Sequence, residues 1–242
     1  MTQASLFDDA PLIPGLDYRN GMLDPDEESM LITKIDELPL TPFRFQGWTG
    51  KRLTLSLGWT YDFDNGRFGP SDPIPPWLQL TKARAAAFAG IADADLVQAL
   101  LIRYDPGAGI GWHRDRPVFE HVVGISLGSP TTLRFRRRTT KGFDRLSVPV
   151  APRSIYRLSG EARHEWEHSI AGMDTRRWSI TFRSLSAKGA EASRTNPLFP
   201  PNARPYRDHR QQRKGGGLMS HCHMPITAEM KSLTSAAGVR LF

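Results

Sequence analysis

An imidazole and a carboxylate lie one residue apart in the segment GWHRDRP at residues 111–117, as His113 and Asp115. Two kinds of enzyme use such a pair. In protein kinases, a His-Arg-Asp triplet belongs to the catalytic loop, and its Asp accepts the proton of the substrate hydroxyl. In mononuclear iron enzymes, a His and a carboxylate bind one metal ion together with a second His. The rest of the chain has to distinguish these two chemistries.

The kinase interpretation needs further motifs that this sequence lacks. An Asn should follow the His by seven residues, and that position is Glu120. No G-x-G-x-x-G segment lies upstream, and no Asp-Phe-Gly lies downstream. The sequence therefore excludes a kinase.

The metal interpretation requires His113 and Asp115 to point the same way. On a short strand they would do so, because side chains alternate between the two faces. A second His would complete a facial triad that holds Fe(II) and leaves three positions open for substrate and oxygen. Zinc is more often tetrahedral, and the single cysteine of the chain, Cys222, cannot form a cysteine cluster near this pair.

Six other histidines could supply the third ligand. Three of them lie in the C-terminal tail and are poor candidates: His209, His221 and His223. His121 begins a predicted strand directly after the pair. His164 and His168 belong to GEARHEWEHSI, where an extended strand would place both on one face. We expect His168 to be the ligand, because it lies deeper in the predicted strand.

The segment RRWSITFR at residues 176–183 has two chemically different faces if it is a strand. One face carries two guanidinium groups and two hydroxyls: Arg177, Ser179, Thr181 and Arg183. The other face carries three large apolar side chains: Trp178, Ile180 and Phe182. Two guanidinium groups inside a barrel would suit a small dianion, because each can pair with a carboxylate in a bidentate manner. A half-exposed edge strand with solvated arginines would give the same pattern.

The elements that must position these residues follow a simple order. Asp24, Pro25 and Glu27 have the spacing of a helix start with a capping box, and an apolar stripe follows at Met30, Leu31, Ile35 and Leu38. A second helix is expected over residues 75–90, opened by prolines and ended by Gly90. Short strands and turns are expected over residues 41–69 between the helices.

From about residue 97 the pattern becomes that of short strands separated by turn residues. We expect seven of them, at residues 97–105, 121–128, 131–138, 144–150, 154–160, 166–172 and 176–185. This spacing predicts a β-sandwich or barrel that is braced by helices from the N-terminal part.

Length and charge suggest one domain with polar ends. The chain has 242 residues and a net charge of +7, but residues 1–186 hold 23 basic and 22 acidic side chains. The last 56 residues hold nine basic and three acidic ones, so the basicity belongs to the tail. We expect a flexible N-terminus at 1–11, a domain at 12–186 and a disordered basic tail at 187–242. No apolar run could span a membrane, no secretory signal is evident, and one cysteine fits a reducing compartment, so a cytoplasmic monomer is expected.

Four spaced elements resemble the AlkB-like family of 2-oxoglutarate/Fe(II)-dependent dioxygenases over about residues 12–186. Tyr104 lies nine residues before His113, the H-x-D pair follows, and His168 lies 53 residues after Asp115. The fourth element is R-x-S-x-T-x-R at residues 177–183. The resemblance is densest at residues 103–117, 122–135, 156–170 and 176–183.

The resemblance implies a double-stranded β-helix, or jelly roll, with supporting N-terminal helices. His113, Asp115 and His168 would bind Fe(II), and O2 and 2-oxoglutarate would be consumed. Arg177 would hold the distal carboxylate of 2-oxoglutarate, assisted by Tyr104 and Ser179, and Arg183 would lie nearer the metal-bound end of 2-oxoglutarate or the substrate. Two positions depart from the bacterial pattern, because Ile102 and Ser179 stand where relatives often have Asn. Neither change removes the main charge pairing.

The same resemblance implies oxidation of a C–H bond, which on an N-alkylated base ends in release of an aldehyde. Residues 47–63 lie where relatives carry a nucleotide-recognition lid. Candidate substrate contacts are Trp48, Lys51, Arg52, Trp59, Tyr61 and Glu120. Cationic and aromatic side chains of this kind suit phosphates and a flipped-out base, although single aromatic residues can equally pack in the core. The arginine-rich segment at residues 133–138 could contact a phosphate backbone or form a solvated hairpin.

The N-terminal segment QASLF resembles the bacterial sliding-clamp-binding peptide. Gln3 would anchor the peptide by hydrogen bonds, while Leu6 and Phe7 would fill an apolar pocket of the clamp. These features favour dealkylation of DNA bases. Three alternatives remain: oxidation of a modified tRNA base, demethylation of a protein side chain, and a nucleic-acid-binding module with a vestigial site.

Overall fold

A computed structural model of the chain describes residues 13–45, 47–63 and 66–195. The predicted clamp peptide with Gln3, Leu6 and Phe7 lies outside the described residues, as do the side chain of Trp48 and most of the predicted tail. Among the described residues, no helix has the length and apolar character that crossing a bilayer requires.

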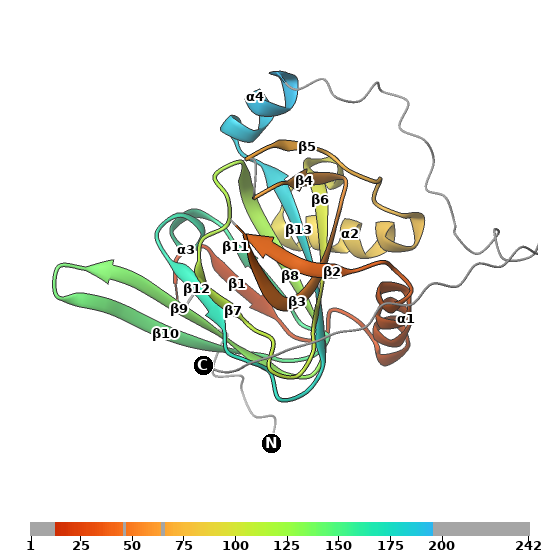
Figure 1. Cartoon of the computed structure of the whole chain (residues 1–242), viewed down its shortest axis with the longest axis horizontal. Coiled ribbons are helices and arrows are strands. Elements are labelled where there is room, and N and C mark those ends of the chain that lie inside the picture. Colours follow the sequence, from red (N-terminus) through yellow and green to blue (C-terminus); the bar gives the residue numbers. More distant parts are fainter. Residues whose placement is uncertain (1–12, 46, 64–65, 196–242) are drawn as a thin grey trace, which may run out of the picture. The chain divides into compact units, whose positions relative to one another are not determined.

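Seven antiparallel strands form the larger sheet, in the order β1-β11-β8-β13-β6-β3-β2 (Figure 1). They are β1 (Leu16–Arg19), β2 (Thr41–Phe45), β3 (Trp48–Leu57), β6 (Leu96–Tyr104), β8 (Phe119–Gly128), β11 (Ile155–Leu158) and β13 (Arg177–Leu185). Strand β13, the RRWSITFR segment, lies in the middle of this sheet. The interpretation of that segment as an exposed edge strand is therefore wrong.

Four strands form the smaller sheet, in the order β10-β9-β12-β7. They are β7 (Ile110–His113), β9 (Thr131–Thr139), β10 (Gly142–Val150) and β12 (Glu167–Ile170). The β9–β10 hairpin is longer than its neighbour β12 and projects beyond it (Figure 1). A separate pair, β4 (Trp59–Tyr61) with β5 (Phe68–Pro70), completes the strands of the described part. Two facing antiparallel sheets confirm the predicted jelly roll.

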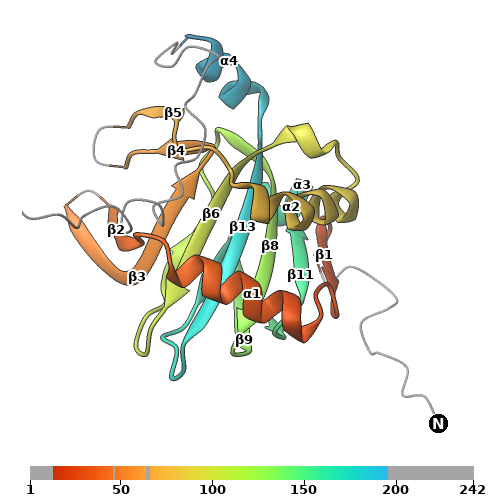
Figure 2. The ribbon, with the colours of Figure 1, turned by 90° about the vertical axis from the view of Figure 1, so that its right-hand side faces the viewer.

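Two helices, α1 (Pro25–Asp36) and α2 (Pro76–Ala89), cover the outer face of the larger sheet (Figure 2). Helix α1 starts as expected: the Asp24 side chain accepts from the Glu27 amide, and the Glu27 side chain accepts from the Asp24 amide. Helix α2 ends at Gly90, whose φ of 68° is the left-handed conformation that favours glycine.

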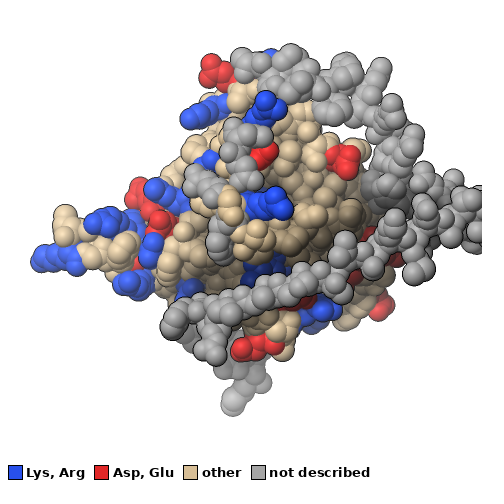
Figure 3. Space-filling view, viewed as in Figure 1, with Lys and Arg blue, Asp and Glu red and all other residues tan. Residues whose placement is uncertain are grey.

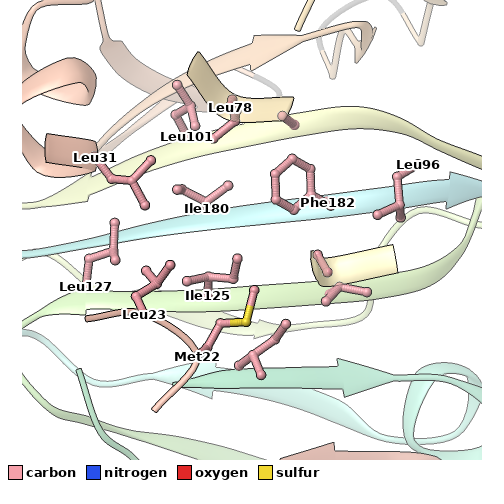
Figure 4. Close-up of a cluster of buried hydrophobic side chains, with 14 of the residues drawn as sticks. Met22, Leu23, Leu31, Leu78, Leu96, Leu101, Ile125, Leu127, Ile180 and Phe182 are labelled. Carbon is pink, nitrogen blue, oxygen red and sulfur yellow. The ribbon is translucent and has the colours of Figure 1, made fainter. Parts of the chain in front are cut away.

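The main apolar core lies between these helices and the sheet (Figure 4). Leu31 and Ile35 of α1 are fully buried there, whereas Met30, expected in the same stripe, is 42% exposed. Ile180 and Phe182 of β13 contribute to this core from below, and Trp178 packs at its edge. The apolar face of β13 thus meets the helices, which leaves the polar face for the space between the two sheets.

Two local expectations are corrected by the structure. Residues Gly160–His164 form the short helix α3 rather than a strand, so His164 does not share a strand face with His168. A 3-10 turn, η1 (Asp93–Asp95), precedes β6. The ordered domain continues beyond residue 186 as helix α4 (Ala187–Thr195), although we expected the disordered tail to begin there. Ser186 holds this helix, because its amide donates to Val118 O and its Oγ accepts from the Gly189 amide.

Candidate metal centre

Strand register brings the two predicted histidine ligands together. His113 ends β7 and His168 lies in β12, and the two residues are directly paired across the antiparallel ladder. Their ring centroids are 4.2 Å apart. On the other side of β12, His168 is paired with Phe135 of β9, a fully buried residue of the inner face. Both imidazoles therefore lie inside the jelly roll, 55 residues apart in sequence and adjacent in space.

Asp115 reaches the same place by a different route from the one that we expected. Strand β7 ends at His113, so Asp115 lies in the loop after it rather than on a shared strand face. Arg183 of β13 holds the carboxylate: its Nε and Nη2 donate to Oδ1 over 2.8 and 2.7 Å. The other oxygen, Oδ2, lies 3.6 Å from His168 Nε2 and has no hydrogen-bond partner.

The three side chains form a group that could hold a metal ion. One ligand atom from each of His113, Asp115 and His168 can be chosen so that all lie within 4.8 Å of one another. His121 and His164, the alternatives closest in sequence, do not belong to this group. His164 instead lies 2.9 Å from the Glu120 carboxylate through its Nε2.

Burial sets the protonation state of the group. Burial lowers the pKa of His168 to about 3, assisted by the neighbouring His113, and burial also lowers the pKa of His113. Burial alone would raise the pKa of Asp115, but the Arg183 guanidinium and the nearby histidines hold it well below its ordinary range. At neutral pH the site therefore presents two neutral imidazoles and one carboxylate, which is the state that metal binding requires.

A second unsatisfied group lies on the same inner face of the larger sheet. Arg177 of β13 is 1% exposed, and only its Nη2 finds a hydrogen-bond acceptor, the Ser126 Oγ at 3.2 Å. Its Nε and Nη1 are buried without a partner. Within the described residues, no carboxylate pairs with this guanidinium. Because a buried, unpaired cation is costly, the arrangement indicates a place for an anion.

The predicted neighbours of Arg177 are close to it. Tyr104 of β6 is its cross-strand partner, and the guanidinium carbon lies 5.2 Å from the centre of that ring. Ser179, two residues along β13, is buried and is paired across the ladder with Ser126. Arg183 lies at the metal end of the same face, as expected. Arg177 and the Arg183 that holds Asp115 thus lie on one face of β13, six residues apart along the strand.

The sequence interpretation missed two residues of this lining. Ser126, the hydroxyl partner of Arg177, could have been found from the alternation along β8. Tyr156 of β11 lies against Gly124, where an added Cβ would come within 2.2 Å of the phenol ring, so glycine is required. Burial raises the pKa of Tyr156 to about 12, and the charged groups that act on it include Arg177. Its phenol therefore stays protonated.

The predicted substrate contacts are divided between several places. Arg52 of β3 is 7% exposed, stacks at 3.8 Å on Phe43 and leaves its Nε without a partner. Tyr61 is partly buried, and its hydroxyl accepts from Arg116 Nη2 over 2.5 Å. Trp59 instead stacks on Phe68 in an apolar cluster, at 4.9 Å. Glu120 pairs with His164, and Lys51 is exposed.

Arg52 lies close to the metal group, and Tyr61 accepts a hydrogen bond from Arg116, the residue after Asp115. Arg52 is near enough to His113 to lower its pKa, and the burial of Arg52 lowers its own. Arg116, which holds Tyr61, follows Asp115 directly in the chain and also lies 5.2 Å from the Phe63 ring. The residues beside the candidate metal centre are therefore cationic and aromatic.

Comparisons with known proteins agree with this geometry. A family model described as "2OG-Fe(II) oxygenase superfamily" matches residues 24–196. The chain is 28% identical over 164 residues to a Xenopus tropicalis tRNA (carboxymethyluridine(34)-5-O)-methyltransferase, alkbh8; the match covers 66% of this chain and only a quarter of that protein. It is 24% identical over 201 residues to a zebrafish protein named probable RNA/DNA demethylase ALKBH6, covering 76% of this chain and 81% of the relative.

A solved structure supports the fold alone. The protein titled "The structure of OsALKBH1" aligns with a TM-score of 0.52 at 16% identity, over 70% of this chain and 96% of that one. The family match covers most of the described domain and includes every residue of the candidate metal centre.

Proposed function

Because the chain belongs to the AlkB-like 2OG-Fe(II) oxygenases, we propose that it removes N-alkyl groups from nucleic-acid bases by oxidation, with alkylated DNA as the favoured substrate. The chain is an oxidoreductase of the dioxygenase class, with Fe(II), 2-oxoglutarate and O2 as its cofactor and cosubstrates. This sets aside the interpretation as a binding module with a vestigial site. The substrate and the role of each residue are the proposed part.

His113, Asp115 and His168 are the proposed Fe(II) ligands. The unpaired Oδ2 of Asp115 and the two neutral imidazoles match the donor set that Fe(II) takes in this class of site. Arg183 fixes the Asp115 carboxylate through Oδ1 and leaves Oδ2 for the metal. When bound, iron and 2-oxoglutarate supply the oxidation of a substrate C–H bond by O2, with succinate and CO2 as coproducts.

Arg177 is the proposed anchor for the distal carboxylate of 2-oxoglutarate, and its two unpaired nitrogens are the observation that carries the proposal. They lie buried on the inner face that leads to the metal group, and the Tyr104 ring and the hydroxyls of Ser126 and Ser179 surround them. A carboxylate placed there would satisfy both nitrogens in a bidentate pair. Tyr156, kept protonated, can donate a further hydrogen bond.

The nucleic-acid part of the proposal is supported by the rim of the site. Arg52 is a buried cation with an unpaired Nε beside His113, which suits a phosphate or a base oxygen. Tyr61 and Phe63 with Arg116 offer faces on which a base can stack. Glu120 and Trp59 remain weaker candidates for substrate contact. Glu120 is already paired with His164, and Trp59 is already stacked on Phe68.

A modified tRNA base is the second candidate substrate. The observation that favours it is the similarity to the Xenopus protein, whose name refers to carboxymethyluridine 34 of a tRNA. The matched quarter of that protein need not perform its named methyl transfer, so an oxidation of the base is the corresponding expectation here.

Release of succinate and formaldehyde tests the proposed function. Purified, iron-loaded protein with 2-oxoglutarate is offered single-stranded DNA that contains 1-methyladenine or 3-methylcytosine, and in parallel a methylated tRNA. Formaldehyde equal to succinate on the DNA is the expected result. Succinate without formaldehyde from either substrate would reject dealkylation but keep the oxygenase chemistry.

We also propose a cytoplasmic monomer that reaches DNA through the sliding clamp, by way of Gln3, Leu6 and Phe7. A pull-down with the clamp tests this part by itself. Leu6→Ala/Phe7→Ala should abolish capture, and equal capture of the variant would remove the clamp from the proposal without affecting the chemistry.

A further inference from the structure

Strand β9 divides its arginine-rich segment between two sides of the smaller sheet. Phe135 points into the jelly roll, and Arg137 lies on the same side, two residues along. Arg134, Arg136 and Arg138 therefore point outward. Their cross-strand neighbours on β10 are Ser147, Arg145 and Phe143 respectively. The run of arginines is thus not one cluster but two sets with different surroundings.

We name the outward set, with its neighbours, the outer basic face. It consists of Arg114, Arg134, Arg136, Arg138, Arg145, Trp112 and Phe143. Figure 3 shows basic side chains gathered over the projecting β9–β10 hairpin.

The inward arginine is already neutralised by carboxylates. Arg137 contacts Glu161 at 2.8 Å, Asp144 at 3.3 Å and Glu165 at 3.4 Å, and it lies over the Trp166 ring. This side is an ion-pair network that fastens the hairpin to helix α3. It has no spare positive charge for a ligand.

The outer basic face, in contrast, has five arginines and one carboxylate partner. Among the residues that the structure describes, only Arg136 of this face forms an ion pair, with Glu167 at 2.5 Å. Arg134 donates to the Ser169 hydroxyl, and Arg114 donates to the carbonyl of His164. For Arg138 and Arg145, the contacts among the described residues are with the Phe143 ring, at 5.8 and 5.4 Å. Four guanidinium groups thus keep an uncompensated charge.

Aromatic rings hold these guanidinium groups by their flat faces. Trp112 lies beneath Arg134 and Arg136, at 5.3 and 4.6 Å, and Phe143 lies beneath Arg136 at 4.7 Å as well as beneath Arg138 and Arg145. Stacking occupies the face of a guanidinium but not its N–H edge, which remains free for bidentate pairing with a phosphate. The rings also reduce the number of conformations that must be lost on binding. A merely solvated arginine run would not need this support.

The outer basic face begins at the candidate metal centre. Arg114 lies between the two predicted ligands His113 and Asp115, and Glu167 and Arg136 are paired beside the His168–Phe135 pair. A surface cavity of about 390 Å3 is lined by Arg114, Arg136, Arg138, Phe143 and Glu167, and also by Arg137 and Glu165 of the ion-pair network. The face therefore lies on the outer side of the same sheet whose inner side carries His113 and His168, and a polyanion bound there would run along these strands.

We propose that the outer basic face binds the phosphodiester backbone of the nucleic-acid strand whose base enters the metal centre. This inference rests on the proposed function, because it assigns a second contact region to the same substrate. A phosphodiester chain is the occupant that the charge favours: it repeats single negative charges, while the face presents several separate guanidinium edges.

Binding as a function of salt concentration tests the proposal with the full chain. The probe is a fluorescein-labelled single-stranded DNA of about 20 nucleotides, with an RNA of the same sequence in a second arm. The test variant is the double substitution Arg138→Ala/Arg145→Ala. Arg137→Ala is the control on the same hairpin, because each substitution removes one positive charge per residue. Lys34→Ala, in helix α1 and paired with Glu37, controls for net charge far from the hairpin.

The double variant should bind DNA roughly tenfold more weakly and lower the slope of log K against log salt by about 1.4, which corresponds to two lost phosphate contacts. Arg137→Ala and Lys34→Ala should change this slope by less than half of the change that one lost phosphate contact causes. Equal losses in Arg137→Ala would reduce the effect to general charge and overturn the proposal. If the double variant loses more affinity for the RNA than for the DNA, the outer basic face still binds a phosphodiester backbone, but RNA is its preferred strand.

Chemistry measured on a short substrate separates this inference from the proposed function. A methylated trinucleotide can enter the metal centre but is too short to cover the hairpin. The double variant should demethylate it as fast as the wild type, while its KM on the long DNA rises. If the wild type dealkylates long DNA and the double variant binds it unchanged, the inference fails and the proposed function stands. If the wild type neither binds nor dealkylates nucleic acid, both fail.

Discussion

Arginines occur in two regions of this protein under opposite physical conditions. Inside the jelly roll, Arg177 is buried and has two guanidinium nitrogens without a partner, while the mostly buried Arg183 is paired with Asp115. On the outer basic face, Arg138 and Arg145 are exposed and stack on Phe143. A buried charge interacts strongly because water does not screen it, whereas an exposed one is screened by solvent and salt. The same side chain therefore positions chemistry in one region and attracts a large ligand in the other.

The largest expected effect is on the inner region itself. His168→Ala should reduce 2-oxoglutarate turnover by at least 1,000-fold, on the order seen when a group essential to a catalytic unit is removed, because one of three ligands is lost. His164→Ala is the matched control, since His164 pairs with Glu120 outside the group and should keep its turnover. Succinate release and circular dichroism measure both. Full turnover in a folded His168→Ala protein would contradict the proposed triad.

Arg177→Ala should raise the KM for 2-oxoglutarate by about 100-fold, the loss of a bidentate charged pair. Its effect on the stability of the cosubstrate-free protein should be small or favourable, because the guanidinium has no anion there and is costly to bury. Steady-state kinetics and thermal unfolding with and without 2-oxoglutarate measure the two effects. A large loss of stability without 2-oxoglutarate would instead indicate a structural role.

Arg183→Ala, unlike Arg177→Ala, should destabilise the cosubstrate-free protein. It leaves the buried Asp115 carboxylate without its cation, and breaking a buried pair costs about 3 kcal/mol of unfolding free energy. The pKa of Asp115 should rise, so metal binding should fail at a higher pH than in the wild type. Denaturant unfolding and Fe(II) or Mn(II) titrations at several pH values follow both changes, and Arg183→Lys should recover part of each.

The metal-free protein should lose stability as the pH falls from about 6.5 toward 3. The folded pKa of His168, about 3, lies below its unfolded value near 6.5. The unfolded chain therefore binds the proton more tightly in that window, and the loss should reach about 2 kcal/mol at pH 5. Chemical unfolding at pH 5 and 7 measures it. His168→Gln should remove the loss of unfolding free energy that His168 causes between pH 7 and pH 5. If the variant keeps the same pH dependence, His168 is not its cause.

The smallest effect is expected on the outer basic face. Arg138→Ala should change the free energy of unfolding by less than about 0.5 kcal/mol, as is usual for exposed side chains without ion pairs. Arg137→Ala should cost more, because three carboxylates lose their shared cation. Thermal unfolding of the two variants compares them directly. If Arg138→Ala were the more destabilising, the outer face would be structural rather than free to bind.

Local patterns predicted those features whose causes are local. The Asp24–Glu27 capping box and the Gly90 end of α2 follow from groups a few residues apart, and both are present. The alternation of β13 separated an apolar face from a polar one, because the strand has a period of two. His168 was preferred to His164 because it lies deeper in the predicted strand, and it is His168 that lies in the metal group. Asp115 was correctly expected near His113, but for the wrong reason. We expected it on the same strand face, and it lies in the loop after β7.

Contacts between distant segments could not be predicted in this way. That Arg183 would hold Asp115, that Ser126 would meet Arg177, and that Tyr156 would lie over Gly124 depends on strand order and register between residues far apart in the chain. Helix α4 was missed because its start depends on Ser186 meeting Val118.

The sequence by itself determined the chemistry: which side chains can bind a metal, which cations can meet a dianion, and which long segments form the helices α1 and α2 and the strands of the domain. Only the tertiary structure decided which charges are paired. In β9, neighbouring arginines look alike in the sequence, yet Arg137 meets three carboxylates and Arg138 meets none among the described residues. The physical reason is that alternation and hairpin pairing place adjacent side chains on opposite sides of a sheet, and the partners on each side come from other parts of the chain.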